Sequence, residues 1–318
     1  MLKKIICFLT AAFFLFPAFE ISADDTVSGT FDSGISWNIS GSVMTVSGTG
    51  EMGDVRYQPY ASYSSSVTSV IINEGVSSVG WGAFSNFQNL RSVSLPQSLE
   101  SIDVNAFSYC YNLYDINIPE SVEYIGSNAF YGTYFISGIE GDFIVLGDGI
   151  LYSYKGSDER IVIPDNVKSI ADRAFVSEKY ASLIYIPENV KTISENAFLN
   201  CTNLKYAVIS PETETIGNNS LGYILDPAPV LKGDFRIYSR SGSAAEKYAS
   251  GNNIDFSIMG DIDGDGQVTS YDALIILQTV TGSADISEEQ KISADTDMDS
   301  DITSYDALAL LQYITGGF

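Results

Sequence analysis

The sequence predicts a mostly β chain of modular build: a repetitive β-solenoid with a β cap at its N-terminal end, followed by a small α-helical domain. Three patterns support this fold class. An Ala-Phe pair recurs through the middle of the chain at steps of 23, 23, 45 and 23 residues. Ahead of it, between Thr30 and Met52, apolar and polar residues alternate as in half-buried strands. Near the C-terminus, an acidic motif followed by an apolar run occurs twice.

Residues 1–23 are expected to form a secretory signal peptide. Lys3 and Lys4 precede an apolar run from Ile5 to Phe19, and Ile21-Ser22-Ala23 provides a small-residue cleavage site before Asp24. This pattern is typical of a cleaved signal rather than of a membrane span. No other apolar stretch is long enough to cross a bilayer. The sequence therefore predicts a secreted, extracellular protein with no membrane span.

The composition excludes several classes of function. A net charge of −24 leaves no basic patch for nucleic acid or for an anionic membrane. The 318 residues contain no histidine, which removes the usual general base of nucleophilic triads and the commonest transition-metal ligand. Asp and Glu are abundant, but none is repeated on the inner strands, and a stacked 23-residue repeat offers no deep cleft to hold a pair of catalytic carboxylates. We therefore predict no catalytic residues and a protein that is not an enzyme.

Residues 24–66 are predicted to form the β cap. The alternation there is built around Trp37, Ile39, Val43 and the run Met44-Thr45-Val46. The end of a solenoid exposes an unpaired sheet edge and an open core, so it needs such a cover.

Residues 67–240 are predicted to form the solenoid itself. A period of 23 residues built on Leu and Ile positions indicates a leucine-rich repeat. In the unit from Leu113 to Phe130, Ile116 and Ile118 alternate along a short strand that Pro119 ends. Stacking such turns about 4.8 Å apart makes a parallel sheet over a continuous apolar core. The unit resembles the bacterial surface-antigen (BspA-type) leucine-rich repeat over Val67 to about Pro227, a family whose ligands are diverse.

One segment of the solenoid, about 136–157, departs from the repeat. Its runs Phe143 to Leu146 and Ile150 to Tyr154 flank Gly147-Asp148-Gly149 and predict a β-hairpin. Cys110 and Cys201 hold the same phase of the repeat four turns apart, on the order of 20 Å, whereas a disulfide bridges roughly 7 Å at most between Cα atoms. We predict two buried, unbridged thiols.

The last turns of the solenoid carry the only apolar corner among its outward side chains, formed by Leu183, Tyr185, Tyr206 and Val208. Clustered exposed apolar groups usually mark a contact, so this corner is a candidate ligand patch. The alternative is that the hairpin or the segment near Pro227 covers it. Phe235 to Tyr238 is predicted as a last strand, and residues 241–258 as a capping helix, from Ser243 to Ala249, and a linker.

Residues 259–318 contain the duplicated acidic phrase, which has the spacing of a calcium loop. Ca²⁺ takes roughly six to eight oxygens, and loop positions 1, 3, 5, 7, 9 and 12 can wrap around it. In the first loop these positions are Asp261, Asp263, Asp265, the carbonyl of Gln267, Thr269 (directly or through water) and Asp272; in the second they are Asp295, Asp297, Asp299, the carbonyl of Asp301, Thr303 and Asp306. So many carboxylates repel one another without cations, so we predict two Ca²⁺ ions whose binding contributes to folding.

The two loops differ at one position. Gly266 stands at position 6 of the first loop, where the chain needs a left-handed turn, and Ser300 replaces it in the second. The second site is therefore expected to be the weaker. Both loops end in Asp rather than the longer Glu, so closure around the ion requires a tighter loop.

Each loop runs into an apolar helix, Ala273 to Thr281 and Ala307 to Thr315, with no amphipathic helix ahead of it as in an ordinary EF-hand. Between the copies, Ser287 and Gln290 form a capping box that starts a short connecting helix. This duplicated loop and helix (F-hand) resembles the type I dockerin of bacterial polysaccharide-degrading complexes over Gly260 to Gly316. The resemblance implies calcium-dependent binding to a cohesin module of a scaffoldin. The family's contact positions fall on Ser270, Tyr271, Leu277 and Gln278, and on Ser304, Tyr305, Leu311 and Gln312.

The identity of the two contact sets implies a dual binding mode, in which either helix faces the cohesin after a half-turn. The alternative for Leu277 and Leu311 is core packing, since both lie within apolar runs. We therefore predict a noncatalytic component of a multi-enzyme polysaccharide-degrading complex. Its solenoid is expected to bind a polysaccharide, a cell-wall component or a protein. Two alternatives are a glycoside hydrolase or other polysaccharide-active enzyme of such a complex and a cell-surface adhesin.

Overall fold

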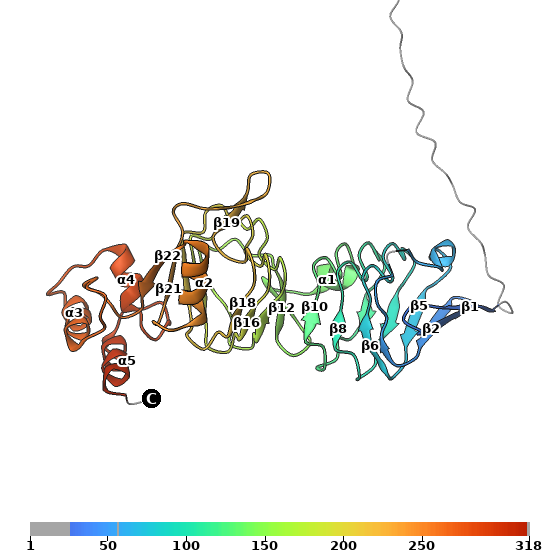
Figure 1. Ribbon diagram of the computed structural model, residues 1–318, viewed down its shortest axis with the longest axis horizontal. Coiled ribbons are helices and arrows are strands. Elements are labelled where there is room, and N and C mark those ends of the chain that lie inside the picture. The colour runs from blue at the N-terminus through green and yellow to red at the C-terminus, as the bar shows by residue number, and fades with distance from the viewer. Residues whose placement is uncertain (1–25, 56, 317–318) are drawn as a thin grey trace, which may run out of the picture.

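The computed structural model describes residues 26–55 and 57–316, so the expected signal peptide lies outside the described residues. The strands stack into an elongated solenoid that begins at β1 (Thr26–Thr30) and ends beside three helices, α3 (Ser270–Val280), α4 (Glu288–Ala294) and α5 (Ser304–Thr315) (Figure 1). The fold class is the predicted one. Within the described residues no helix is both long and apolar enough to cross a membrane.

The first half of the solenoid has two sheets. In the larger, β1 to β3 form the predicted cap, and their pairing is antiparallel. Strand β3 then pairs in parallel with the first repeat strand, which the sequence did not specify. Its members after β1 are β2 (Ser36–Ser40), β3 (Val43–Ser47), β5 (Ser69–Ile72), β7 (Ser92–Ser94) and β9 (Asp115–Ile116). The smaller sheet contains β4 (Gly50–Glu51), β6 (Val76–Val79), β8 (Ser101–Ile102) and β10 (Tyr124–Ile125). A short 3₁₀ turn, η1 (Ala61–Tyr63), and helix α1 (Tyr134–Gly138) complete this half.

The predicted hairpin forms between β11 (Phe143–Leu146) and β12 (Ile150–Tyr154). The hairpin is part of the solenoid, because β12 pairs in parallel with β14 (Ser169–Ile170) and so starts one of the two sheets of the second half. That sheet continues through β16 (Thr192–Ile193) and β18 (Thr215–Ile216). The other runs through β13 (Arg160–Val162), β15 (Leu183–Ile186), β17 (Tyr206–Ile209), β21 (Arg236–Ser239) and β22 (Asp255–Ile258).

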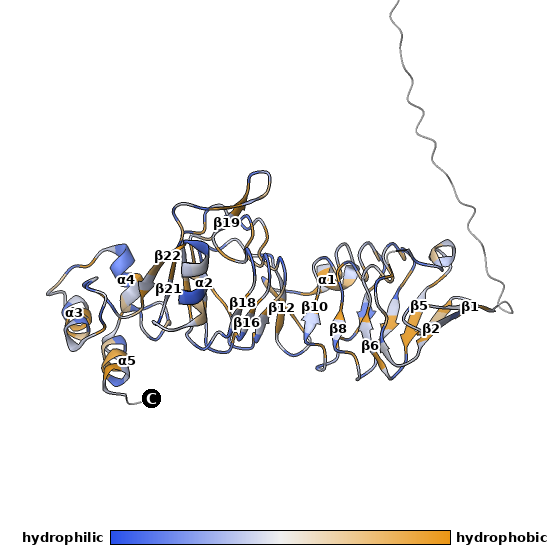
Figure 2. Ribbon diagram, in the orientation of Figure 1, coloured by the Kyte–Doolittle hydropathy of each residue, from blue (hydrophilic) through white to orange (hydrophobic). Residues whose placement is uncertain are grey.

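The 23-residue period appears directly as strand register and as stacked rings. Ser69 pairs with Ser92 and Ser92 with Asp115, each one period further along the chain. The rings of Phe84 and Phe107 stack with centroids 5.3 Å apart, and Phe107 and Phe130 stack at 5.5 Å. Apolar residues accordingly recur along the strands (Figure 2). One repeat could not bury its Phe alone, so stability comes from the stack.

The segment that leads to the C-terminal domain is more ordered than expected. Helix α2 (Ala244–Asn252) starts at Ser243, whose side chain caps it, as the sequence predicts. The following residues, expected as linker, instead form β22, which pairs in parallel with β21. A strand paired into the solenoid sheet therefore leads straight to Met259. A further hairpin, β19 (Tyr223–Leu225) and β20 (Pro229–Leu231), lies on the side of the solenoid.

Cys110 and Cys201 are both buried and unbridged, as predicted. Each thiol donates to the carbonyl of a residue in the preceding repeat, 26 residues earlier, Phe84 at 3.0 Å and Phe175 at 3.1 Å. Burial raises the pKa of the Cys110 thiol to about 12 and that of Cys201 further. We expect neither thiol of the folded protein to react with Ellman's reagent at pH 8 until denaturant is added, because the thiolate is the nucleophile. Rapid labelling of the native protein would contradict this burial.

Candidate functional site

The first acidic loop brings three of its predicted ligands together. Oxygens of Asp261, Asp263 and Asp265 lie within 4.8 Å of one another. The loop holds them through its own amides: Gly264 and Gly266 donate to Asp261 at 2.9 and 3.0 Å, and Asp265 donates to Asp263 at 3.1 Å. The loop is thus curled around a small cluster of negative charge.

The second loop repeats this geometry. Asp295, Asp297 and Asp299 also lie within 4.8 Å of one another, and the amide of Ser300 donates to Asp295 at 3.1 Å as that of Gly266 does to Asp261. Ser300 takes a φ of 78°, against 86° for Gly266. The left-handed turn that the sequence predicts is therefore present, and a Ser Cβ makes it less favourable than Gly does.

The last carboxylate of each loop, Asp272 or Asp306, also caps the helix that follows the loop. Asp272 is fully buried, accepts from the amide of Ile262 at 2.8 Å, and closes a capping box with Thr269 at the start of α3. Asp306 and Thr303 do the same for α5. These bonds tie the end of each loop to its beginning. Whether both Asp residues and both Thr residues also bind the ion, together with the carbonyls of Gln267 and Asp301, stays a prediction.

The second loop buries a carboxylate whose negative charge a bound cation would balance. Asp295 is only 2% exposed, and its Oδ1 is a buried oxygen without a hydrogen-bond partner among the described residues. Burial, supported by the nearby carboxylates of Asp306 and Asp297, raises the pKa of Asp295 to about 6. A hard divalent cation suits this all-oxygen donor set, because Ca²⁺ prefers carboxylate and carbonyl ligands. The residues present therefore fit calcium, which would neutralise the cluster and close the loop.

The predicted partner-binding side chains lie on the surface of α3 and α5. Seven of the eight are exposed: Ser270, Tyr271, Leu277, Gln278, Ser304, Tyr305 and Gln312. The eighth, Leu311, is half-buried against the core shared by these helices, whereas Leu277 is exposed. Core packing thus accounts in part for Leu311 but not for Leu277.

The candidate ligand patch on the solenoid is not a free surface. Leu183, Tyr185 and Val208 are buried in one cluster with Met259 and Ile292 of the C-terminal domain, and Tyr206 packs beside them. Neither the β11–β12 hairpin nor the segment near Pro227 belongs to this cluster as described. The apolar corner needed a cover, and the C-terminal domain supplies it.

Hydrogen bonds between side chains of the solenoid and groups of the C-terminal domain surround this apolar cluster. Arg160 donates to the carbonyl of Ser300 at 3.1 Å, so a solenoid side chain bonds the left-handed residue of the second loop. Glu289 of α4 accepts from Tyr206 at 3.1 Å and from Arg236 at 3.2 Å. The Arg240 guanidinium lies 4.3 Å from the centroid of the Tyr313 ring. These contacts join residues far apart in the chain, so the 23-residue period does not indicate which residues take part in them.

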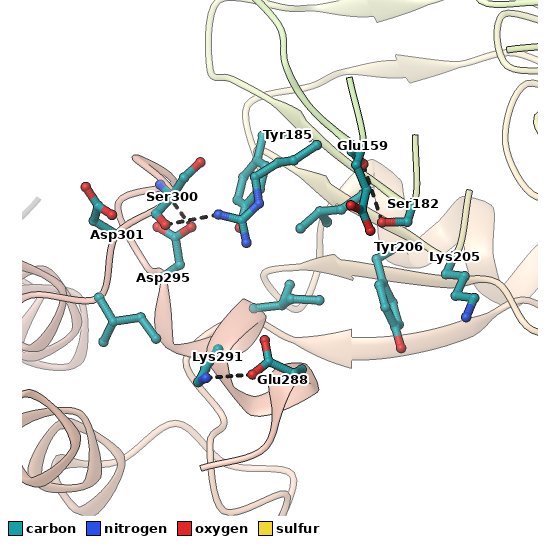
Figure 3. A pocket seen from close by; sticks show the side chains of 14 residues that line it. Glu159, Ser182, Tyr185, Lys205, Tyr206, Glu288, Lys291, Asp295, Ser300 and Asp301 are labelled. Carbon is teal, nitrogen blue, oxygen red and sulfur yellow. Dashed lines mark hydrogen bonds and ion pairs between the residues drawn. The ribbon is translucent and has the colours of Figure 1, made fainter. Parts of the chain in front are cut away.

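A hollow of about 740 Å³ remains at this junction (Figure 3). Tyr185 and Asp295 both line this hollow and lie near each other (Figure 3). Burial, together with the nearby Asp295 carboxylate, raises the pKa of Tyr185. Lys291 bonds Glu288 at 2.6 Å on the opposite wall. The second loop is therefore packed against the solenoid through its first ligand, because Asp295 is buried whereas the equivalent Asp261 of the first loop is only partly buried.

Comparison with known proteins divides the chain in the same way. The family described as BspA type leucine rich repeat region matches residues 57–142 and 146–224 in six copies, and the family described as dockerin type I domain matches residues 259–315. No curated protein matches the chain.

Similar solved structures are bacterial leucine-rich-repeat proteins. One from Eubacterium ventriosum is 18% identical, with 69% of this chain and 73% of that chain covered and a TM-score of 0.34. A leucine rich cell surface protein from Faecalibacterium prausnitzii is 18% identical, with 78% and 99% covered and a TM-score of 0.30. One from Bacteroides ovatus is 18% identical, with 76% and 68% covered and a TM-score of 0.31.

Proposed function

Because the chain belongs to the BspA-type leucine-rich-repeat family and carries a type I dockerin domain, we propose that it is a secreted component of a multi-enzyme polysaccharide-degrading complex. The dockerin binds a cohesin module of a scaffoldin and so attaches the protein to a cell-surface or extracellular scaffold. The leucine-rich repeats serve as a binding or adhesion surface. Both kinds of module bind rather than catalyse, so the proposed role is noncatalytic.

One observation carries the cohesin proposal. Two helices that follow acidic loops of matching geometry present the same side chains, Ser-Tyr in the first turn and Leu-Gln two turns later, almost all of them exposed. Exposed apolar and aromatic side chains on a rigid helix face are typical of protein-binding surfaces. The contact with the solenoid uses α4, the second loop and Tyr313, and leaves these faces accessible.

We propose two calcium ions as cofactors, one in each loop, held by the ligand sets predicted from the sequence. Calcium would draw the carboxylates of each loop together and set the start of α3 and α5. Since the cohesin-binding side chains begin at the first residue of each helix, loop geometry sets their position.

The test is a calorimetric titration of the chain from residue 24 against a panel of cohesins, with calcium and with excess EDTA. Tight binding that chelation abolishes supports the proposal. A chain that folds around calcium yet binds no cohesin of the panel argues against it.

The dual binding mode predicts an asymmetric response to mutation. We expect Leu277→Asp alone to lower cohesin affinity by about 2-fold at most, since α5 can replace α3 after a half-turn. Adding Leu311→Asp should lower it by more than roughly 100-fold, as loss of a central apolar contact does at other interfaces. Leu277→Asp should keep wild-type calcium binding, because Leu277 is exposed. For the double variant, a calcium titration reports separately on the fold, because Leu311 is half-buried in the dockerin core. If Leu277→Asp alone abolishes binding, α3 is the sole binding face.

A further inference from the structure

Three exposed tyrosines cluster on the first half of the solenoid, where each repeat turns after its Ala-Phe pair. Tyr109, Tyr111 and Tyr131 are 40%, 52% and 56% exposed. The Tyr109 ring meets the other two edge to face, with centroids 6.1 Å from Tyr111 and 5.4 Å from Tyr131. We call these three residues the tyrosine platform. Aromatic residues about half exposed leave a large apolar area in water, and a cluster of three is a feature typical of contact surfaces.

Tyr109 also occupies a backbone position that suits it poorly. Its φ is 61°, in the left-handed region that bulky side chains avoid. The repeat imposes this conformation, because the equivalent residues Asn86, Gly132, Ser177 and Asn200 have φ of 66°, 78°, 61° and 66°. Those four are small or can form local hydrogen bonds, and Tyr109 is the exception. A residue held against its preference is a reason to look for function.

A hollow of about 490 Å³ adjoins the platform and includes Tyr109 in its lining. Side-chain amides, hydroxyls and one indole line most of the rest, among them Trp81, Ser85, Asn86, Asn105 and Ser108, and Ala61 and Gly82 complete it. The hydroxyls of Ser85 and Ser108, from successive repeats, bond each other at 2.9 Å. Ser108 is buried, so the accessible polar groups here include those of Ser85, Asn86 and Asn105. None of the described residues that line this hollow is charged, although the chain as a whole carries −24.

We propose that the tyrosine platform and this hollow bind a neutral polysaccharide. The apolar ring of Tyr offers a flat face for the C–H side of a pyranose, while its hydroxyl stays hydrated. Amide and hydroxyl groups match the many hydroxyls of a sugar, and a few such polar groups among aromatic walls are the usual make-up of a small-ligand site. An uncharged lining suits an uncharged ligand, and the strongly negative protein repels acidic polymers.

This inference rests on the proposed function and sharpens it, because it assigns a ligand class and a location to the noncatalytic binding surface. It also moves that surface away from the corner covered by the dockerin. The platform lies on turns that precede α1, whereas the dockerin packs on β15, β17 and β21 at the other end of the solenoid (Figure 1). Both partners could then be held at once.

The decisive variant is Tyr109→Asn, which installs the residue found at this position in two other repeats. It should raise the thermal midpoint or leave it unchanged, because Asn accepts the left-handed conformation more readily. It should also weaken binding to soluble mixed-linkage β-glucan, xyloglucan or galactomannan by roughly tenfold or more in affinity gel electrophoresis. If Tyr109 had only a structural role, the substitution would not weaken polysaccharide binding while the thermal midpoint stayed unchanged or rose. Tyr180→Asn, an exposed tyrosine of the second half, is the matched control and should bind like wild type.

The outcomes separate cleanly. The inference is supported if wild type binds at least one of these neutral polymers and Tyr109→Asn and Tyr111→Ser both weaken it. It is overturned if wild type binds none of them, if the platform variants bind like wild type, or if anionic polygalacturonate binds as well as the neutral polymers. Cohesin titration of the same preparations tests the proposed function separately. Intact cohesin binding with no polysaccharide binding means that the platform alone fails.

Discussion

Removal of calcium is expected to lower the unfolding midpoint of the dockerin by on the order of 15–30 °C while leaving that of the solenoid nearly unchanged. A ligand at 1,000 times its dissociation constant stabilises the folded state by about 4 kcal/mol. In a domain of this size each kcal/mol corresponds to roughly 4–8 °C. We expect the dockerin to depend on calcium because its core is small, with Ile262, Ala273, Ile276, Ala307 and Leu310 among its buried side chains.

The physical reason is charge. Three carboxylates of each loop lie within 4.8 Å of one another, and Asp295 is buried as well, so they repel one another unless a cation balances their charge. A bound calcium ion would attract all of these carboxylates. Because the site exists only in the folded domain, the free energy of calcium binding would add to the free energy of folding. The measurement is differential scanning calorimetry of the chain from residue 24 in calcium and in EDTA. An EDTA trace that superimposes on the calcium trace would show that the loops do not hold a structural ion.

Replacing Ile292 with Asp is expected to release the dockerin from the solenoid. Ile292 is buried among Leu183, Tyr185 and Val208, and burying an Ile side chain contributes about 2 kcal/mol or more. An aspartate there would have to stay buried and unpaired, which costs more than exposing the contact to water. The two modules should then move independently about Met259.

Small-angle X-ray scattering checks this release, with calorimetry as the second readout. We expect a larger radius of gyration and two separated transitions for Ile292→Asp, with calcium binding to the first loop unchanged. Leu274→Asp, an exposed position on α3, is the control and should scatter like wild type. Arg236→Ala should have a smaller effect than Ile292→Asp, because partly exposed ion pairs such as Arg236–Glu289 contribute roughly 0–1 kcal/mol. Identical scattering of Ile292→Asp and wild type would rule out docking through this cluster.

Much of the fold and of the candidate calcium site could be predicted because the information is local. A 23-residue period puts Phe84, Phe107 and Phe130 in one ring stack whatever the rest of the chain does. The calcium loops likewise draw their carboxylates from twelve consecutive residues, so spacing alone brings Asp261, Asp263 and Asp265 together. Even the left-handed turn at Ser300 follows from its place in the loop.

The contact between the modules could not be predicted in this way. The apolar corner of Leu183, Tyr185, Tyr206 and Val208 indicates that a cover is needed, but Ile292 reaches it from about a hundred residues further along the chain. Strand β22 was missed because a four-residue strand at a sheet edge has too few residues to show a period. Its pairing with β21 decides the direction in which the dockerin leaves the solenoid.

The sequence by itself determined the two modules, their order, the β cap and the acidic loops, since each is a short-range pattern whose meaning is set by backbone geometry and ligand spacing. The tertiary structure decided which exposed aromatic groups are free. It buries Tyr185 beneath the dockerin and leaves Tyr109, Tyr111 and Tyr131 in solvent. That outcome depends on how two folded surfaces fit, and the fit is set by the shape and register of whole elements rather than by neighbouring residues in the chain.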